Sequence, residues 1–326
     1  MNRRRTAVWI ALLVLLSASC LVRLMLTRTT AGELFLAWPT SEYLSYRLIP
    51  MFSALIVGGV LGSSGMGLQV LLRNPLASPW ILGLSSGAGL GVMASMMLAH
   101  YKGAPVLEGE TIGAIAGAFA ALFVVFILAR GRGGLDPLTM VLVGVVVSVI
   151  CGAGIMTLQH LVPAGLRGSF ITWLMGSLPE TLSMTRLVLY GGVGCIGILL
   201  LAWWGPSLDA ACLSDDEATS VGVHLPSLRF KLFFVSSVLA AIGVVIAGPI
   251  AFVGLIAPHG ARLLFRSNHR TIALGSAGVG ALLLVSADDL RQLIDLGTGR
   301  LPVGIVTSIL GGLVFLVLLI RNRGNV

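Results

Sequence analysis

Long apolar stretches, separated by short polar ones, make up most of this 326-residue chain. A helix needs roughly 20 apolar residues to cross the hydrocarbon core of a membrane. The stretches are continuous rather than alternating, which excludes a β-barrel. The pattern predicts an all-α, polytopic membrane protein with about ten transmembrane helices, several of them short or broken. The predicted crossings are Ala7–Leu26, Met51–Leu72, Ile81–Leu98, Thr111–Leu128, Leu138–Leu161, Leu187–Trp204, Phe233–Ala247, Ile250–Leu264, Thr271–Ala287 and Pro302–Ile320.

Two of the predicted breaks fall at proline or glycine inside apolar sequence. Arg73-Asn74-Pro75 ends the second crossing, and Gly248-Pro249 separates the seventh from the eighth. Interrupted helices at membrane depth are tolerated only where they face protein or a water-filled cavity. Breaks in both halves of a chain are typical of transporters built from repeats. We therefore expect the breaks to mark a transport pathway.

The longest polar stretch, Pro206–Lys231, has the sequence of a short capped helix. Ser214 is a suitable N-cap, Asp215–Glu217 place three acids in the first turn, and Gly222 is a stop signal. Such a segment cannot lie in hydrocarbon and must reach a membrane face. It is either a solvated surface helix or a docking site for a partner protein. In the docking interpretation, Ala218 and Val221 would pack into a groove of the partner.

Composition and charge agree with a membrane protein. Charged residues are 10% of the chain and hydrophobic residues 56%, against roughly 25% charged in soluble domains. The net charge of +8 indicates orientation rather than nucleic-acid binding, because arginines cluster at segment ends. Placing both termini in the cytoplasm puts thirteen of the 21 basic residues inside: Arg3, Arg4, Arg5, Arg73, Arg130, Arg132, Arg229, Lys231, Arg262, Arg266, Arg270, Arg321 and Arg323.

The chain shows no signature of ATP or metal binding. Its two lysines, Lys102 and Lys231, do not lie in a glycine-rich phosphate loop. Transport driven by ATP would therefore need a nucleotide site on another polypeptide. The four cysteines have no close metal-ligand spacing, and we interpret them as packing residues. The basic N-terminus precedes a long apolar run without a clear cleavage site, so we expect this run to be the first crossing.

Several stretches in order along the chain resemble the FecCD-type permeases. They are 57–69, 73–89, 206–231, 248–262 and 301–307. These permeases are the membrane subunits of type II ATP-binding-cassette (ABC) importers for iron-siderophores, haem and cobalamin. The resemblance implies one permease domain over 1–326, with the coupling loop at 206–231 in the cytoplasm. It also implies a location in the bacterial inner membrane and no enzymatic activity in this chain.

The resemblance further implies partners and a cargo. The partners are a second permease subunit, two nucleotide-binding subunits that carry the ATP, and an extracytoplasmic binding protein. The expected cargo is a metal chelate, an iron-siderophore first, with haem and cobalamin open. The sequence does not decide between a homodimer and a heterodimer.

The matching motifs assign roles to particular residues. The expected contacts to the ATPase subunit are Ser214, Asp215, Asp216, Glu217, Ala218, Thr219 and Gly222. The expected cytoplasmic gate comprises Asn74, Pro75, Leu76, Pro137 and Leu138, within 74–76 and 136–139. The expected docking residues for the binding protein are Arg47, Arg291 and Arg300. The docking assignment departs from the family pattern at Pro50, Leu293 and Arg300.

Other residues have structural interpretations beside functional ones. Pro249, Pro258 and His259 are expected to shape the second break, with His259 a structural residue rather than a proton relay or ligand. Asp288 and Asp289 are expected to form a cap or an ion pair with Arg291, or to take part in docking. Gly58, Gly59, Gly62 and Gly65 are expected to permit close helix packing.

Two functions outside the importer family fit fewer features of the sequence. An ion-coupled secondary transporter should place acids in mid-membrane, and no acid lies centrally in an apolar segment. Gly62-Ser63-Ser64-Gly65 also matches the motif of rhomboid-type intramembrane proteases, which pair the serine with a histidine on another helix. That motif is short and lies inside the longer match to the importer family.

Overall fold

The computed structural model describes residues 3–28, 34–103, 106–131, 134–294 and 301–323. Two short strand pairs occur in this part, β1 (Leu26–Arg28) with β2 (Leu34–Leu36) and β3 (Arg130–Gly131) with β4 (Gly134–Leu135). The rest is helical, as expected. The helices are α1 (Arg3–Met25), α2 (Ser41–Leu71), the 3-10 turn η1 (Pro79–Leu82), α3 (Leu84–Lys102), α4 (Val106–Leu128), α5 (Pro137–Leu161), α6 (Ala164–Leu174), α7 (Met184–Trp203), α8 (Gly205–Ala211), α9 (Asp215–Ser220), α10 (Leu225–Ala247), α11 (Val253–Phe265), α12 (His269–Leu293) and α13 (Val303–Arg323).

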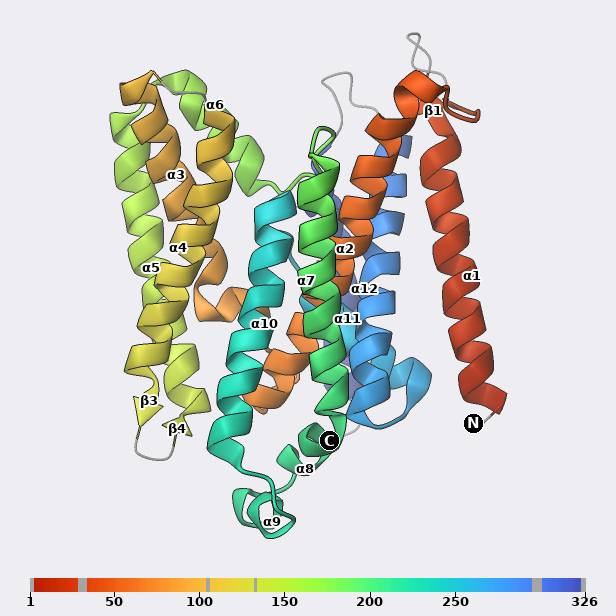
Figure 1. Cartoon of the computed structure of the whole chain (residues 1–326), viewed down its shortest axis with the longest axis vertical. Helices are drawn as coiled ribbons and strands as arrows, with labels where there is room; N and C mark the ends of the chain where they lie inside the picture. The colour runs from red at the N-terminus through yellow and green to blue at the C-terminus, as the bar shows by residue number, and fades with distance from the viewer. Residues whose placement is uncertain (1–2, 29–33, 104–105, 132–133, 295–300, 324–326) are drawn as a thin grey trace.

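The long helices stand side by side in one bundle, with α1 at one edge and α3 to α6 at the other (Figure 1). Seven helices of the described chain are long and apolar enough to cross a membrane, namely α1, α2, α4, α5, α7, α10 and α12. The small helices α8 and α9 project from the end of the bundle where the N-terminus lies (Figure 1). The chain is therefore a multi-pass membrane protein.

Helix α2 forms the centre of the bundle, packed against α7, α10, α11 and α12. Glycines permit this packing, as expected. A Cβ atom on Gly65 would lie 1.7 Å from the carbonyl oxygen of Gly254 on α11, and one on Gly58 would lie 2.3 Å from that of Gly280 on α12. Gly59 differs, because its Cβ would come no closer than 3.7 Å to another atom. Close backbone contact between helices thus requires glycine at Gly65 and Gly58 but not at Gly59.

The two predicted breaks lie next to each other in the structure. The indole Nε1 of Trp80 in η1 donates a hydrogen bond to the carbonyl of Ile250, at 3.3 Å. Ile250 belongs to the segment between α10 and α11, where Gly248 and Phe252 have φ angles of 68° and 65°. Helix α11 has 13 residues, fewer than the roughly 20 of a full crossing. The expectation of a partial helix here is confirmed.

Several boundaries differ from those expected. Helix α2 begins at Ser41 and continues through Pro50. The stretch 206–231 is not one loop, because it folds as α8, α9 and the first turns of α10. Helix α6 was not anticipated from the sequence. The helices extend beyond the predicted bounds because hydropathy detects only apolar residues. Polar residues at helix ends are helical through local packing and do not add to an apolar stretch.

Candidate functional site: the coupling helix and the inner gate

Helix α9 is stabilised at its start by a capping box. The Ser214 main-chain N–H donates to the Glu217 carboxylate at 3.0 Å, and the Glu217 N–H donates to the Ser214 hydroxyl at 3.3 Å. Hydrogen bonds from the Ser214 side chain and main chain hold the pKa of Glu217 below its usual value. At the other end Gly222 has φ of 89°, the left-handed conformation that ends a helix. Both signals were predicted from the sequence.

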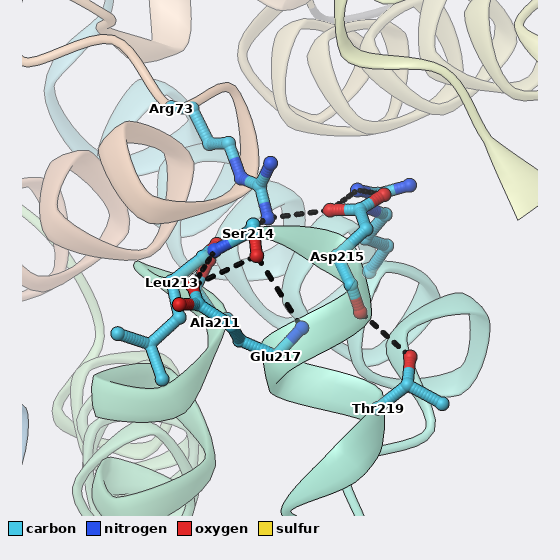
Figure 2. A network of polar contacts seen from close by, with 8 residues as sticks. Arg73, Ala211, Leu213, Ser214, Asp215, Glu217 and Thr219 are labelled. Carbon is cyan, nitrogen blue, oxygen red and sulfur yellow. Dashed lines mark hydrogen bonds and ion pairs between the residues drawn. The ribbon is translucent and has the colours of Figure 1, made fainter.

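An arginine outside α9 links this helix to the end of α2. Asp215 forms ion pairs with Arg73 at 2.6 Å and with Arg229 of α10 at 2.9 Å. Arg73 also donates to the carbonyl oxygens of Ala211 and Leu213, at 3.2 and 3.0 Å (Figure 2). One guanidinium thus contacts the last residue of α8, the α8–α9 linker and the first residue of α9. All three contacts are made by one terminal nitrogen of the guanidinium, Nη2.

The electrostatics of Asp215 follow from these contacts. Partial burial raises the pKa of its carboxyl, but the hydrogen bonds and charges of Arg229 and Arg73 outweigh that effect. The pKa of Asp215 is therefore below its ordinary value. Asp215 stays negatively charged between two cations on α10 and at the end of α2, so α9 is attached to both helices.

The faces of α9 differ from the docking expectation at one residue. Ala218 is completely buried against the rest of the chain, so it cannot pack into a partner groove. The expectation that Ala218 contacts a partner is wrong, because the side of α9 that carries Ala218 packs against the rest of this chain. Val221 is 65% exposed and Leu213 45%. Together with the exposed Asp216 and Thr219, they form the accessible surface of α9.

The first gate segment follows Arg73 directly. Arg73 has φ of 47°, which turns the chain out of α2. The Asn74 side-chain oxygen then accepts a hydrogen bond from the Leu76 N–H at 2.9 Å. Leu76 is 48% exposed, and Pro75 is exposed beside it. The sequence placed the gate here without a role for Arg73, although that residue stands immediately before Asn74-Pro75.

The second gate segment lies at the start of α5. Asp136 is the N-cap and accepts a hydrogen bond from the Thr139 N–H at 2.8 Å. Hydrogen bonds from the Thr139 hydroxyl and main chain lower the pKa of Asp136. Pro137 occupies the first turn, and Leu138 is 68% exposed. Both gate segments therefore present an exposed leucine.

Packing of η1 on α5 connects the two gate segments. A Cβ atom on Gly144 of α5 would lie 2.2 Å from the carbonyl oxygen of Ile81, so the backbones are in contact. The chain after Pro75 is thus placed against the helix that Asp136 caps. Movement of η1 cannot occur without displacing α5 or breaking this contact.

The second break contains the expected prolines. Pro249 and Pro258 are buried, and His259 is half-buried on α11. Three residues after His259, Arg262 donates to the side-chain oxygen of Gln69 on α2. Among the described residues no group of three metal-binding side chains occurs. The Ser64 hydroxyl donates to the carbonyl of Ser236 at 2.6 Å, a backbone acceptor and not the histidine that a protease would need.

The arginines expected to bind an external partner are engaged within the chain. Arg47 donates to the Leu26 carbonyl and, at 3.0 Å, to the Thr27 hydroxyl. Arg291 is 5% exposed and pairs with Asp288, which also pairs with Arg23 of α1. The ion pair of Asp288 with Arg291 is confirmed, but the buried Arg291 is not a surface for docking. Arg300 lies outside the described residues.

Comparisons with known proteins agree with this architecture. Residues 7–321 match the FecCD transport family. The hemin transport system permease protein HmuU of Yersinia pestis is 35% identical, over 93% of both chains. The vitamin B12 import system permease protein BtuC of Klebsiella pneumoniae is 32% identical, over 100% of this chain and 97% of its own. A probable iron chelatin transport system permease protein of Helicobacter pylori is 36% identical, over 86% of this chain and 83% of its own.

A solved structure also matches nearly the whole chain. It is described as an inward-facing conformation of a metal-chelate type ABC transporter. The TM-score is 0.84 at 29% sequence identity, with 97% of this chain and 99% of the other covered. The bundle of α1 to α13 and the sequence match over 7–321 lead to the same conclusion: the chain belongs to the FecCD transport family.

Proposed function

We propose that this chain is the permease subunit of an ABC importer that moves a metal chelate from the periplasm to the cytoplasm. The observation that carries the proposal is that Arg73, the residue directly before the first gate segment, contacts both α8 and α9. A force applied to α9 would reach Asn74–Leu76 through one side chain. The relatives named for hemin, iron chelates and vitamin B12 support the class of cargo.

The cargo belongs to the metal chelates, with an iron-siderophore as the first candidate and haem or cobalamin as the others. No cofactor is assigned to this chain. ATP would bind and be hydrolysed on two partner subunits, which dock on the exposed surface formed by Leu213, Asp216, Thr219 and Val221. Rigid contact is sufficient for such coupling, provided that the gate has two discrete arrangements.

A second permease subunit would complete the pathway. Leu76 and Leu138 are exposed at the two gate segments, and a single bundle leaves these side chains on its outside. A second copy, or a related subunit, facing them would enclose a pore lined by both gates. An extracytoplasmic binding protein would dock at the opposite end of the bundle from α9. The contacts of that docking site are not those of Arg291.

The orientation follows from charge. Arg73 and Arg229 pair with Asp215 of α9. Helix α9 and the strand β3, which contains Arg130, both lie at the end of the bundle where α1 begins (Figure 1). Cytoplasmic loops carry an excess of basic residues. We infer that α9 and both termini are cytoplasmic, in the inner membrane of a bacterium.

The decisive experiment is association with the nucleotide-binding subunit encoded nearest to this chain. The protein and that subunit would be co-expressed, purified together and reconstituted in liposomes. The docking variant combines Asp216→Arg with Val221→Glu, because both side chains point away from the chain's own contacts. The matched control is Arg4→Glu, which changes an exposed residue at the start of α1, at the same end of the bundle as α9 (Figure 1).

Wild type and the control should retain the ATPase subunit, and the docking variant should lose it without loss of fold. ATPase activity stimulated by a loaded binding protein should fall in parallel. Equal retention and equal activity in all three proteins would overturn the proposal that α9 is the docking site.

A further inference from the structure

A cysteine, a histidine and an aspartate lie in line at the base of α8, apart from the gate. The imidazole Nδ1 of His269 lies 2.6 Å from the Asp209 carboxylate, and its Nε2 lies 3.8 Å from the thiol sulfur of Cys212. Cys212 is exposed. The three residues come from α8, its C-terminal cap and the first residue of α12. No local sequence signal indicates this group, because Cys212 and His269 are 57 positions apart in the chain.

The hydrogen bonds decide which imidazole nitrogen faces the thiol as an acceptor. A carboxylate can only accept a hydrogen bond, so Nδ1 of His269 carries a hydrogen and donates it in a hydrogen bond to Asp209. In the neutral ring Nε2 then has a free lone pair directed to Cys212. The Asp209 carboxylate also accepts a hydrogen bond from the main-chain N–H of His269 at 2.9 Å. This second bond fixes the main chain of His269 relative to Asp209. The carboxylate therefore orients the base and stabilises it when it becomes positively charged.

Cations surround the thiol from other elements. Arg73 binds the carbonyl oxygens of Ala211 and Leu213, the residues on either side of Cys212. Arg262 of α11 lies within electrostatic range of the Cys212 sulfur. Of the acids in this region, Asp215 is paired with Arg73 and Asp209 accepts hydrogen bonds from His269. Positive surroundings and a partnered histidine favour a thiolate.

We propose that Cys212 is an activated thiol and a site of reversible modification by low-molecular-weight disulfides. His269 removes the thiol proton, and the Cys212 thiolate attacks one sulfur of the disulfide. A new S–S bond forms to Cys212 as the original disulfide bond breaks. The departing thiolate takes the proton from His269, so the products are one mixed disulfide and one free thiol. The disulfide is the oxidant, and no other co-reactant is needed.

The surroundings of Cys212 differ from those expected for a cysteine with only a packing role. A thiol that only fills space would be buried and inert, whereas Cys212 is exposed and hydrogen-bonded to a base. An adduct on Cys212 would lie two residues from Ser214, the N-cap of α9. The chemistry of the site is independent of any transport role.

The test measures alkylation of the full-length protein in lipid nanodiscs. Iodoacetamide would be added between pH 5.5 and 9, and modification would be located by peptide mass spectrometry. The reference thiol is the double variant Cys212→Ser with Ser220→Cys, which puts an ordinary exposed cysteine on α9. The variants of the base are His269→Gln and Asp209→Asn; the asparagine keeps an acceptor for the His269 main-chain N–H.

Cys212 should react about fivefold faster than the reference thiol at pH 6.5. His269→Gln should abolish this difference, and Asp209→Asn should reduce it. Oxidised glutathione should add one glutathionyl group to wild type, and dithiothreitol should remove it. The proposal is overturned if Cys212 and the reference thiol have the same pH profile, or if His269→Gln leaves the Cys212 profile unchanged.

Discussion

The buried charges that join α1 to α12 provide the sharpest test of the packing. Asp288 is 0% exposed and forms ion pairs with Arg23, at 2% exposed, and Arg291, at 5%. Asp288→Asn keeps the shape of the side chain but removes its charge. Two guanidinium groups then remain buried in the bundle without their shared carboxylate.

The magnitude follows from the burial. Removing one partner of a buried pair costs about 3–5 kcal/mol, because an uncompensated charge stays in a medium of low polarity. Asp289 also lies in the cluster, where it accepts a hydrogen bond from Ser19 of α1 at 2.6 Å. Its carboxylate compensates part of the remaining charge. We therefore expect the lower end of the range, about 3 kcal/mol.

The assay is reversible unfolding of the purified protein in mixed detergent micelles, followed by circular dichroism. The control is Asp216→Asn on the exposed face of α9, which should change the free energy of unfolding by less than about 0.5 kcal/mol. The triple variant Arg23→Met, Asp288→Leu and Arg291→Met should be more stable than Asp288→Asn, because it leaves no unpaired guanidinium group in the bundle. Equal stability of Asp288→Asn and Asp216→Asn would refute the assignment of a buried ion cluster.

Three further predictions concern α2, the gate and the coupling helix. Gly65→Ala should prevent folding or lower the unfolding temperature sharply, because its Cβ would lie 1.7 Å from a backbone oxygen. Gly59→Ala should be tolerated, because its Cβ would lie 3.7 Å from the nearest atom. The measurement is the yield of monodisperse protein for each variant. The folded protein lowers the pKa of Asp136, so the charged cap stabilises α5 fully above the unfolded-state pKa of about 3.9. This stability is lost as the pH falls through the lower pKa of the folded state. The free energy of unfolding of Asp136→Asn should therefore depend less on pH in that range than that of the wild type. Arg73→Ala should impair the ATPase activity stimulated by the binding protein in liposomes, because it removes the contacts of Arg73 with the Ala211 and Leu213 carbonyls and with Asp215. Unchanged stimulation in the alanine variant would contradict this.

Local sequence signals correctly predicted the features that depend only on residues close together in the chain. The cap at Ser214 and the stop at Gly222 both join groups within a few residues of each other. Such contacts form in any context that allows a helix, so their residue types are sufficient to predict them. Helix boundaries were less predictable, as the start of α10 at Leu225 shows. Hydropathy locates the part of a helix in lipid and not the polar turns beyond it.

The sequence by itself determined an all-α membrane bundle, two broken helices and a capped helix at one membrane face, because hydropathy and proline, glycine and capping residues act locally. Tertiary structure alone decided the partners of the charges. Arg73 meets residues about 140 positions away and Asp288 meets Arg23 across 265, and Ala218 is buried by its neighbours rather than by its own character. Arg291 was expected to meet a binding protein, but the packing of α1 against α12 buries it together with Asp288 and Arg23. Contacts between distant segments depend on how the helices pack, which no local pattern encodes.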